Sequence, residues 1–131
     1  FVMISDGECQ EGTTWESLLI ASSHNLENLT VIVDYNKIQA LTPINEALPL
    51  DDLSAKFKAF NFDCTEIKDG HSFDEIVPSF LQDNTSFRPK VFIVHTIKGK
   101  GIKSFENDPK WHARKIKGEE LLIGKKELGI I

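Results

Sequence analysis

The sequence lacks several features that would place it in a special class of protein. None of its apolar runs approaches the roughly 20 residues of a membrane-spanning helix, and no signal-peptide pattern is visible. Its two cysteines, Cys9 and Cys64, are too few for a disulfide framework, so both thiols should be reduced. The sequence also lacks an excess of positive charge: 15 Lys and Arg against 20 Asp and Glu give a formal net charge of −5, which argues against nucleic acid or membrane partners. We therefore expect a cytoplasmic protein.

The chain does contain enough apolar residues for one core, since 40% of its 131 residues are hydrophobic. Apolar runs typical of buried strands occupy residues 1–4, 30–33, 64–67 and 91–97. Helical patterns fall between and after them, at residues 13–25, 51–60, 73 onward and 118–131. Strands that alternate with helices predict a single α/β domain over residues 1–131, with three α/β/α layers and a mainly parallel sheet.

Local signals predict where some of these elements begin and break. Thr13–Glu16 and Ser72–Glu75 both have the form of a capping box, which opens a helix. The first of these helices should end near Asn25. Pro78 lies inside the second, where we expect a kink or an early break. Residues 40–49, with two prolines and no sustained period, predict a loop.

Polar residues follow two of the predicted strands at the point where each ends. Asp6 follows the first strand and Asn36 the second. A strand–helix–strand unit brings both ends to one edge of a parallel sheet, where such sheets bind ligands. Their carboxylate and amide oxygens, with a carbonyl such as that of Ile38, suit Mg²⁺ or Ca²⁺, and the helix after Gly12 favours a phosphate. On spacing alone, a plain turn and a plain strand exit remain the alternative.

Other candidate residues have simpler explanations. Trp15 should pack in the core or at a subunit interface, and His24 should cap its helix or lie on the surface. His95, within an apolar strand, should be a hydrogen-bonded structural residue. Cys64 should act as a small core hydrophobe. The Lys98–Gly101 turn can cradle a phosphate or can be simply solvated.

The order of these residues resembles the thiamine diphosphate motif of transketolases. The matching positions are Asp6–Gly12, Trp15–Glu16, Ala21, Asn28–Leu29 and Val33–Gln39, followed by Phe57–Phe60, Asp69–His71, Lys98–Gly101 and Trp111–His112. The likeness is to the N-terminal, diphosphate-binding half of that family and covers nearly the whole chain. It implies a partial thiamine-diphosphate-binding fold, with a large N-terminal portion expected ahead of Phe1.

The resemblance also implies an activity and partners. Transketolases transfer a two-carbon ketol unit from a ketose phosphate to an aldose phosphate, with thiamine diphosphate as electron sink and Mg²⁺ as its anchor. A separate pyrimidine-binding domain from a neighbouring subunit completes the site. We expect this chain to be the diphosphate-binding subunit of a split transketolase of carbohydrate metabolism. It would be inactive alone and would work as a homodimer or heterotetramer.

By position, the resemblance assigns roles to residues of this chain. Asp6 and Asn36 match the metal ligands, and Ile38 matches the residue that gives its carbonyl. Gly7 matches the residue that donates its backbone N–H to the diphosphate, and Glu8 is placed with the cofactor-binding residues.

Two further residues carry catalytic expectations, and two depart from the pattern. Glu11 matches an acidic residue that links the active sites across the dimer, and His112 matches a histidine that contacts the sugar. Ser5 stands where the family usually has glycine, and Ala113 follows His112 where glycine is usual. The alternatives are another thiamine diphosphate enzyme, such as a 2-oxo acid dehydrogenase subunit, or a non-catalytic subunit whose site Ser5 has closed.

Overall fold

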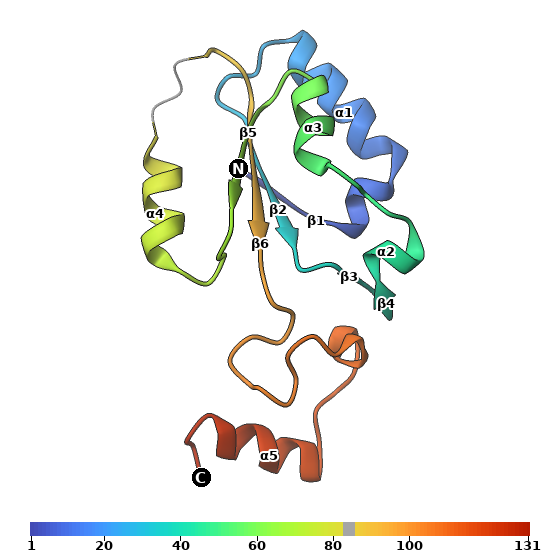
Figure 1. Ribbon diagram of the computed structural model, residues 1–131, viewed down its shortest axis with the longest axis vertical. Coiled ribbons are helices and arrows are strands. Elements are labelled where there is room, and N and C mark those ends of the chain that lie inside the picture. The colour runs from blue at the N-terminus through green and yellow to red at the C-terminus, as the bar shows by residue number, and fades with distance from the viewer. Residues whose placement is uncertain (83–85) are drawn as a thin grey trace.

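A computed structural model describes residues 1–82 and 86–131 and contains a four-stranded parallel sheet. The strands are β1 (Val2–Ser5), β2 (Thr30–Tyr35), β5 (Asp63–Ile67) and β6 (Lys90–His95), in the order β1-β2-β6-β5. Helices α1 (Gly12–Ser23) and α3 (Leu53–Ala59) cover one face, and α4 (Phe73–Leu81) covers the other (Figure 1). The predicted three-layer α/β/α architecture with a parallel sheet is confirmed.

The two faces of the sheet carry separate clusters of apolar side chains. Val33 and Ile93 belong to the larger cluster, together with Phe57 of α3 and Leu18 of α1. Phe92 belongs to the smaller cluster, on the face that α4 covers. Successive side chains of the central strands therefore meet apolar surroundings on both faces, which is why β2 and β6 have nearly continuous apolar sequences.

The start of α1 differs from the prediction. Its N-cap is Glu11, and no side chain caps it, so the predicted capping box of Thr13 and Glu16 is wrong. The short 3₁₀ helix η1 (Gly7–Gln10) runs almost directly into α1. The Thr14 hydroxyl donates instead to the carbonyl of Glu8, at 2.7 Å, which ties η1 to the helix. At the other end, His24 is the C-cap, as expected.

Residues 40–49 do not form the predicted continuous loop. Strands β3 (Ile38–Gln39) and β4 (Thr42–Pro43) form a small antiparallel hairpin, and α2 (Ile44–Ala47) follows directly. Ile44 is only 1% exposed, and its backbone N–H donates to the Lys37 carbonyl at 2.9 Å. One buried isoleucine therefore anchors a segment that is too short to show any period in the sequence.

The prediction for α4 is correct at its start and wrong about an early break. Ser72 is the N-cap, but Glu75 accepts from the Asp69 backbone N–H (3.0 Å), so no reciprocal capping box forms. The helix continues through Pro78 to Leu81. Pro78 and Asp74, whose carbonyl loses its helical donor, are both exposed, so water can satisfy that carbonyl.

After β6 the chain leaves the sheet at the carboxyl ends of the strands and ends in α5 (Glu119–Glu127), apart from the sheet (Figure 1). The short helix η2 (Pro109–His112) lies between them. Phe105, in the segment before η2, is buried and packs on Trp111 of η2, with ring centroids 4.1 Å apart. The predicted closing helix is confirmed. No helix in the described part of the chain is long and apolar enough to cross a membrane.

Candidate functional site

Asp6 lies where the ends of β1 and β2 meet. Its side chain is almost completely buried, at 1% exposure. One carboxylate oxygen, Oδ2, accepts the backbone N–H of Lys37 at 2.6 Å. The backbone N–H of Asp6 donates to the carbonyl of Asp34 at 3.2 Å. The predicted approach of the two strand ends at one edge of the sheet is therefore observed.

Asn36 is held in place by its neighbours at the same edge. Its Nδ2 donates to Oδ2 of Asp34 at 3.2 Å, and its Oδ1 accepts the backbone N–H of Ile38 at 3.0 Å. The hydroxyl of Thr96, just after β6, donates to the other oxygen of Asp34. An amide oxygen can accept two partners, so Oδ1 of Asn36 retains a lone pair for a metal. Residues at the ends of two neighbouring strands thus orient this side chain.

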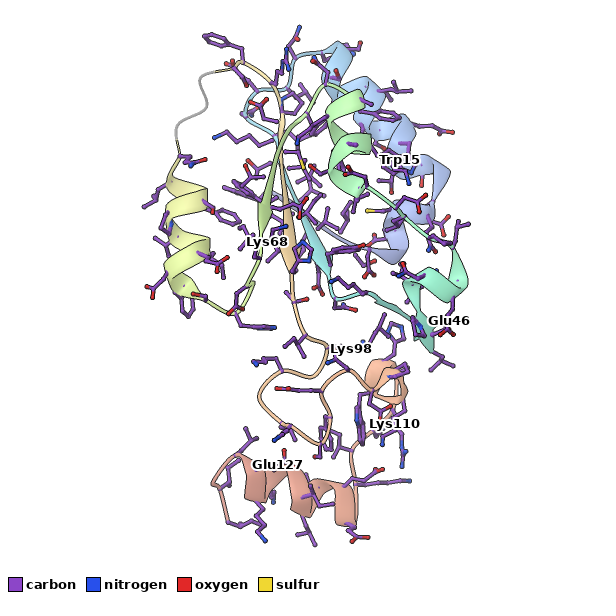
Figure 2. All side chains as sticks on the ribbon, viewed as in Figure 1. Trp15, Glu46, Lys68, Lys98, Lys110 and Glu127 are labelled. Atoms are coloured by element: carbon purple, nitrogen blue, oxygen red, sulfur yellow. The ribbon has the colours of Figure 1, made fainter. Side chains whose placement is uncertain are left out.

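The electrostatics at Asp6 favour a cation. Burial raises the pKa of its carboxyl above the ordinary 3.8, and the nearby Asp34 raises it further. The backbone N–H groups of Lys37 and Gly7, and the ammonium of Lys98, lower this pKa but do not reverse the shift. Lys98 lies just beyond the end of β6 (Figure 2). A buried carboxylate with an acidic neighbour gains most from a bound positive ion.

The donor set fits Mg²⁺ bound together with a diphosphate. Mg²⁺ commonly takes one or two carboxylates and completes its shell with phosphate oxygens and water. Within the described residues, no three or more His, Cys, Asp or Glu side chains are grouped to hold a metal by themselves. Asp6, Asn36 and the Ile38 carbonyl would supply only part of a shell, which leaves positions for the cofactor.

Gly7 lies in a narrow space beside this donor set. A Cβ there would lie 3.3 Å from Cγ of Gln39 and 3.7 Å from the hydroxyl of Ser5. A larger residue would therefore crowd the point where backbone could approach a phosphate.

Ser5 and Glu8 are joined across the η1 turn. The backbone N–H and the hydroxyl of Ser5 both donate to Oε2 of Glu8, at 2.7 and 2.9 Å. The same hydroxyl accepts the backbone N–H of Glu8 at 3.2 Å. The side chain at the position that departs from the family pattern is thus fixed. The carboxylate of Glu8 contacts Ser5, and the role of Glu8 toward a cofactor stays a prediction.

Glu11 and His112 lie outside this bonded network. Glu11 is exposed at the N-cap of α1, and His112 is exposed at the end of η2. Among the described residues, no hydrogen bond or ion pair joins either side chain to Asp6 or Asn36. Their catalytic roles stay predictions.

Some residues around the site were not identified from the sequence. Asp34 carried one signal, since it is a charged residue at the end of an apolar strand. Gln39 is the last residue of the matching stretch Val33–Gln39 but was given no role, and Thr96 carried no signal that separates it from ordinary loop residues. His95 is hydrogen-bonded to Glu66 at 3.1 Å, as predicted, and its structural role stays a prediction. Trp15 packs on Phe57 and Phe60 in the core, which is one of its two predicted locations.

Comparison with known proteins identifies the family. The sequence profile described as "Transketolase, thiamine diphosphate binding domain" matches residues 1–131. The chain belongs to this family. The resemblance found in its motifs is thereby confirmed, as is the thiamine-diphosphate-binding fold that the resemblance implied.

Two relatives in the transketolase family are named as subunits of their enzymes. The chain is 34% identical over 128 residues to one of the subunits of apulose-4-phosphate transketolase from Actinobacillus succinogenes, a match that covers 98% of this chain and 46% of that protein. It is 36% identical over 120 residues to a 6-deoxy-6-sulfo-D-fructose transketolase subunit of a Clostridium species, covering 91% and 43%. The chain therefore spans about half the length of these relatives.

Solved transketolase structures share the fold. The structure of transketolase from Campylobacter jejuni matches with a TM-score of 0.86 and 28% identity, over 97% of this chain and 20% of that one. Transketolase from Leishmania mexicana matches with a TM-score of 0.86 and 25% identity, over 98% and 19%. The chain therefore shares the fold of solved transketolases, and its candidate site lies at the carboxyl edge of the parallel sheet.

Proposed function

We propose that this chain is the metal- and diphosphate-binding part of a split transketolase. The enzyme would transfer a two-carbon ketol unit from a ketose or ketose phosphate to an aldose or aldose phosphate. One observation carries the proposal: the buried Asp6 carboxylate meets the turn after β2, where Asn36 and the Ile38 carbonyl lie. This is an oxygen donor set of the kind that holds Mg²⁺ on a diphosphate.

Each proposed residue has a separate task. Asp6, Asn36 and Ile38 would hold Mg²⁺ (or Ca²⁺), and the Gly7 backbone N–H would donate to the diphosphate, with Glu8 close by in η1. The cofactor, when bound, supplies the electron sink for cleavage of the sugar carbon–carbon bond. His112 would contact the sugar and hold it for reaction.

A second polypeptide is part of the proposal. Two of the relatives described above are named as subunits of their enzymes, which supports a split organisation here. By analogy, a separate chain would supply the pyrimidine-binding domain, and Glu11 would lie at the contact that links the active sites. The complete enzyme would be a homodimer or heterotetramer in the cytoplasm. This chain would be inactive without its partner.

The experiment is calorimetric titration of thiamine diphosphate with Mg²⁺ into the full-length protein mixed with its pyrimidine-binding partner. We expect binding by the wild type and none by Asp6→Ala. Asp74→Ala, which removes an exposed carboxylate from the first turn of α4, is the matched control and should bind normally.

Activity assays separate the two alternatives. Ketol transfer without 2-oxo acid decarboxylation supports transketolase, and the reverse supports the dehydrogenase alternative. A folded wild-type complex that fails to bind the cofactor would favour the non-catalytic alternative, in which Ser5 closes the site.

A further inference from the structure

Gln39, the last residue of β3, has a buried polar atom without a partner. Its side-chain oxygen Oε1 is shielded from solvent, and no hydrogen bond satisfies it in the described part of the chain. A buried acceptor without a partner destabilises the folded state and calls for an explanation. One explanation is a partner that belongs to a ligand.

The position of Gln39 indicates which ligand this is. A Cβ on Gly7 would lie 3.3 Å from Cγ of Gln39 and 3.8 Å from its amide carbon, Cδ. Gly7 directly follows the buried Asp6. The side chain that carries the unpartnered oxygen is therefore next to the residues proposed to hold the metal and the diphosphate, although it comes from a different strand.

The backbone holds Gln39 firmly at this place. Gln39 pairs with Thr42 in the β3–β4 hairpin. The hairpin is fixed to the domain through Ile44, which is buried and donates its N–H to the carbonyl of Lys37. Because the backbone at Gln39 is fixed, its side chain cannot easily move away to find another partner. The oxygen therefore stays unpartnered beside Gly7.

We propose that Gln39 is a further contact residue of the cofactor site, with Oε1 directed toward the Mg²⁺ ion, either directly or through one of its waters. An amide oxygen is a pure acceptor, so only a cation or a hydrogen-bond donor can satisfy it. Mg²⁺ favours oxygen ligands and usually keeps several waters, which can serve as that donor. The inference rests on the proposed function and adds a residue to it.

The test measures how much Mg²⁺ the full-length protein, in complex with its pyrimidine-binding partner, needs to bind thiamine diphosphate. Titrations at fixed cofactor would compare the wild type with Gln39→Ala, Gln39→Met and Gln39→Glu. Removal of a partner around a metal shell typically weakens metal affinity about 10- to 100-fold. We expect Gln39→Ala and Gln39→Met to raise the Mg²⁺ requirement about tenfold, because neither supplies a hard oxygen.

Two variants and one stability measurement make the result specific. Gln39→Glu keeps an acceptor oxygen and should stay within about threefold of the wild type. Gln82→Ala, at the end of α4 on the opposite face of the sheet, is the control and should leave the Mg²⁺ requirement unchanged. Gln39→Met should melt at least as high as the wild type without cofactor, because the unsatisfied oxygen is gone.

The outcomes separate failure of the inference from failure of the proposed function. Normal Mg²⁺ dependence of Gln39→Ala, with a wild type that binds, overturns the inference and leaves the function standing. Weaker binding by Gln39→Glu than by Gln39→Ala also overturns it, because the amide would then face a phosphate. A wild-type complex that does not bind the cofactor overturns both.

Discussion

At the scale of single residues, Asp6 combines a stability cost with a proposed binding role. Its raised pKa means that the folded state holds the proton more tightly than the unfolded chain does. The stabilisation that protonated Asp6 gives the folded state is therefore complete below the ordinary pKa of 3.8, and it is lost as pH rises through the raised pKa. At neutral pH, the ionised carboxylate is kept in place at a cost that a bound cation would offset.

Asp6→Asn should therefore separate stability from binding. Without cofactor, we expect the variant to melt at or above the wild-type temperature at neutral pH, and to lose the pH dependence that Asp6 contributes. Mg²⁺-dependent cofactor binding should disappear. Thermal unfolding across acidic and neutral pH, with calorimetry of the complex, measures both effects. A lower melting temperature of the variant at neutral pH would contradict this. It would show that the hydrogen bond from the Lys37 N–H to the charged carboxylate stabilises the folded state more than burial of the charge destabilises it.

Ser5 offers a second test at the residue scale. Ser5→Gly removes the hydroxyl that binds Glu8, which should lower the free energy of unfolding by about 1 kcal/mol. Because the hydroxyl is tied to Glu8, we expect cofactor affinity to stay within about threefold of the wild type, a difference of less than about 1 kcal/mol. Denaturant unfolding and calorimetry measure the two. A large gain in affinity would mean that Ser5 obstructs the site.

The sequence predicted the central residues of the site better than their surroundings. Asp6 and Asn36 follow apolar strands, so their approach at one edge of the sheet follows from the right-handed crossover alone. The hydrogen bond from Thr96 to Asp34 and the placement of the Gln39 side chain beside Gly7 involve positions far apart in the chain. No local pattern encodes such contacts.

At the scale of elements, the cap of α3 is the clearest local interaction. Asp52 is the N-cap, and its Oδ1 accepts the backbone N–H of Ala55 at 2.8 Å. Asp52→Ala should lower the free energy of unfolding by about 1 kcal/mol, because that N–H loses its partner. Asp52→Asn, which also caps well, is the control and should have little effect. Equal losses in the two variants, measured by denaturant unfolding, would show that charge, and not the cap, is responsible.

The errors in element prediction have a common physical origin. The capping box at Thr13 had the right residues, but η1 runs into α1 and places the N-cap at Glu11. The β3–β4 hairpin was missed because strands of two residues are too short to show alternation. Long apolar runs such as β6 were found because burial on both faces leaves a strong signal.

At the scale of the whole molecule, Gly70 allows the turn after β5 to pack on the end of β6. A Cβ there would lie 2.5 Å from Cγ1 of Val94 and 2.8 Å from the carbonyl of His95. Gly70→Ala should therefore lower the free energy of unfolding by about 1–3 kcal/mol through overpacking. Gly12→Ala, where a Cβ has no neighbour within 4 Å, should be neutral or stabilising. Denaturant unfolding of both variants tests this, and equal effects would contradict it.

The order of the strands was beyond sequence analysis. Alternating strands and helices predicted a parallel sheet, but not that β6 would lie between β2 and β5. That order depends on which faces complement one another in three dimensions. It matters for the site, because it places Thr96, at the exit of β6, beside Asp34 at the end of β2.

The position of β1 has a practical consequence for a preparation limited to residues 1–131. Among the described strands, β1 pairs only with β2, so its other edge has no partner strand within this part of the chain. Met3 on this strand and Phe1 just before it are 68% and 87% exposed. A free, apolar strand edge is a template for aggregation between molecules. A polypeptide limited to residues 1–131 should therefore self-associate. Additives or fusion partners that shield β1 should improve its solubility more than substitutions around Asp6 do.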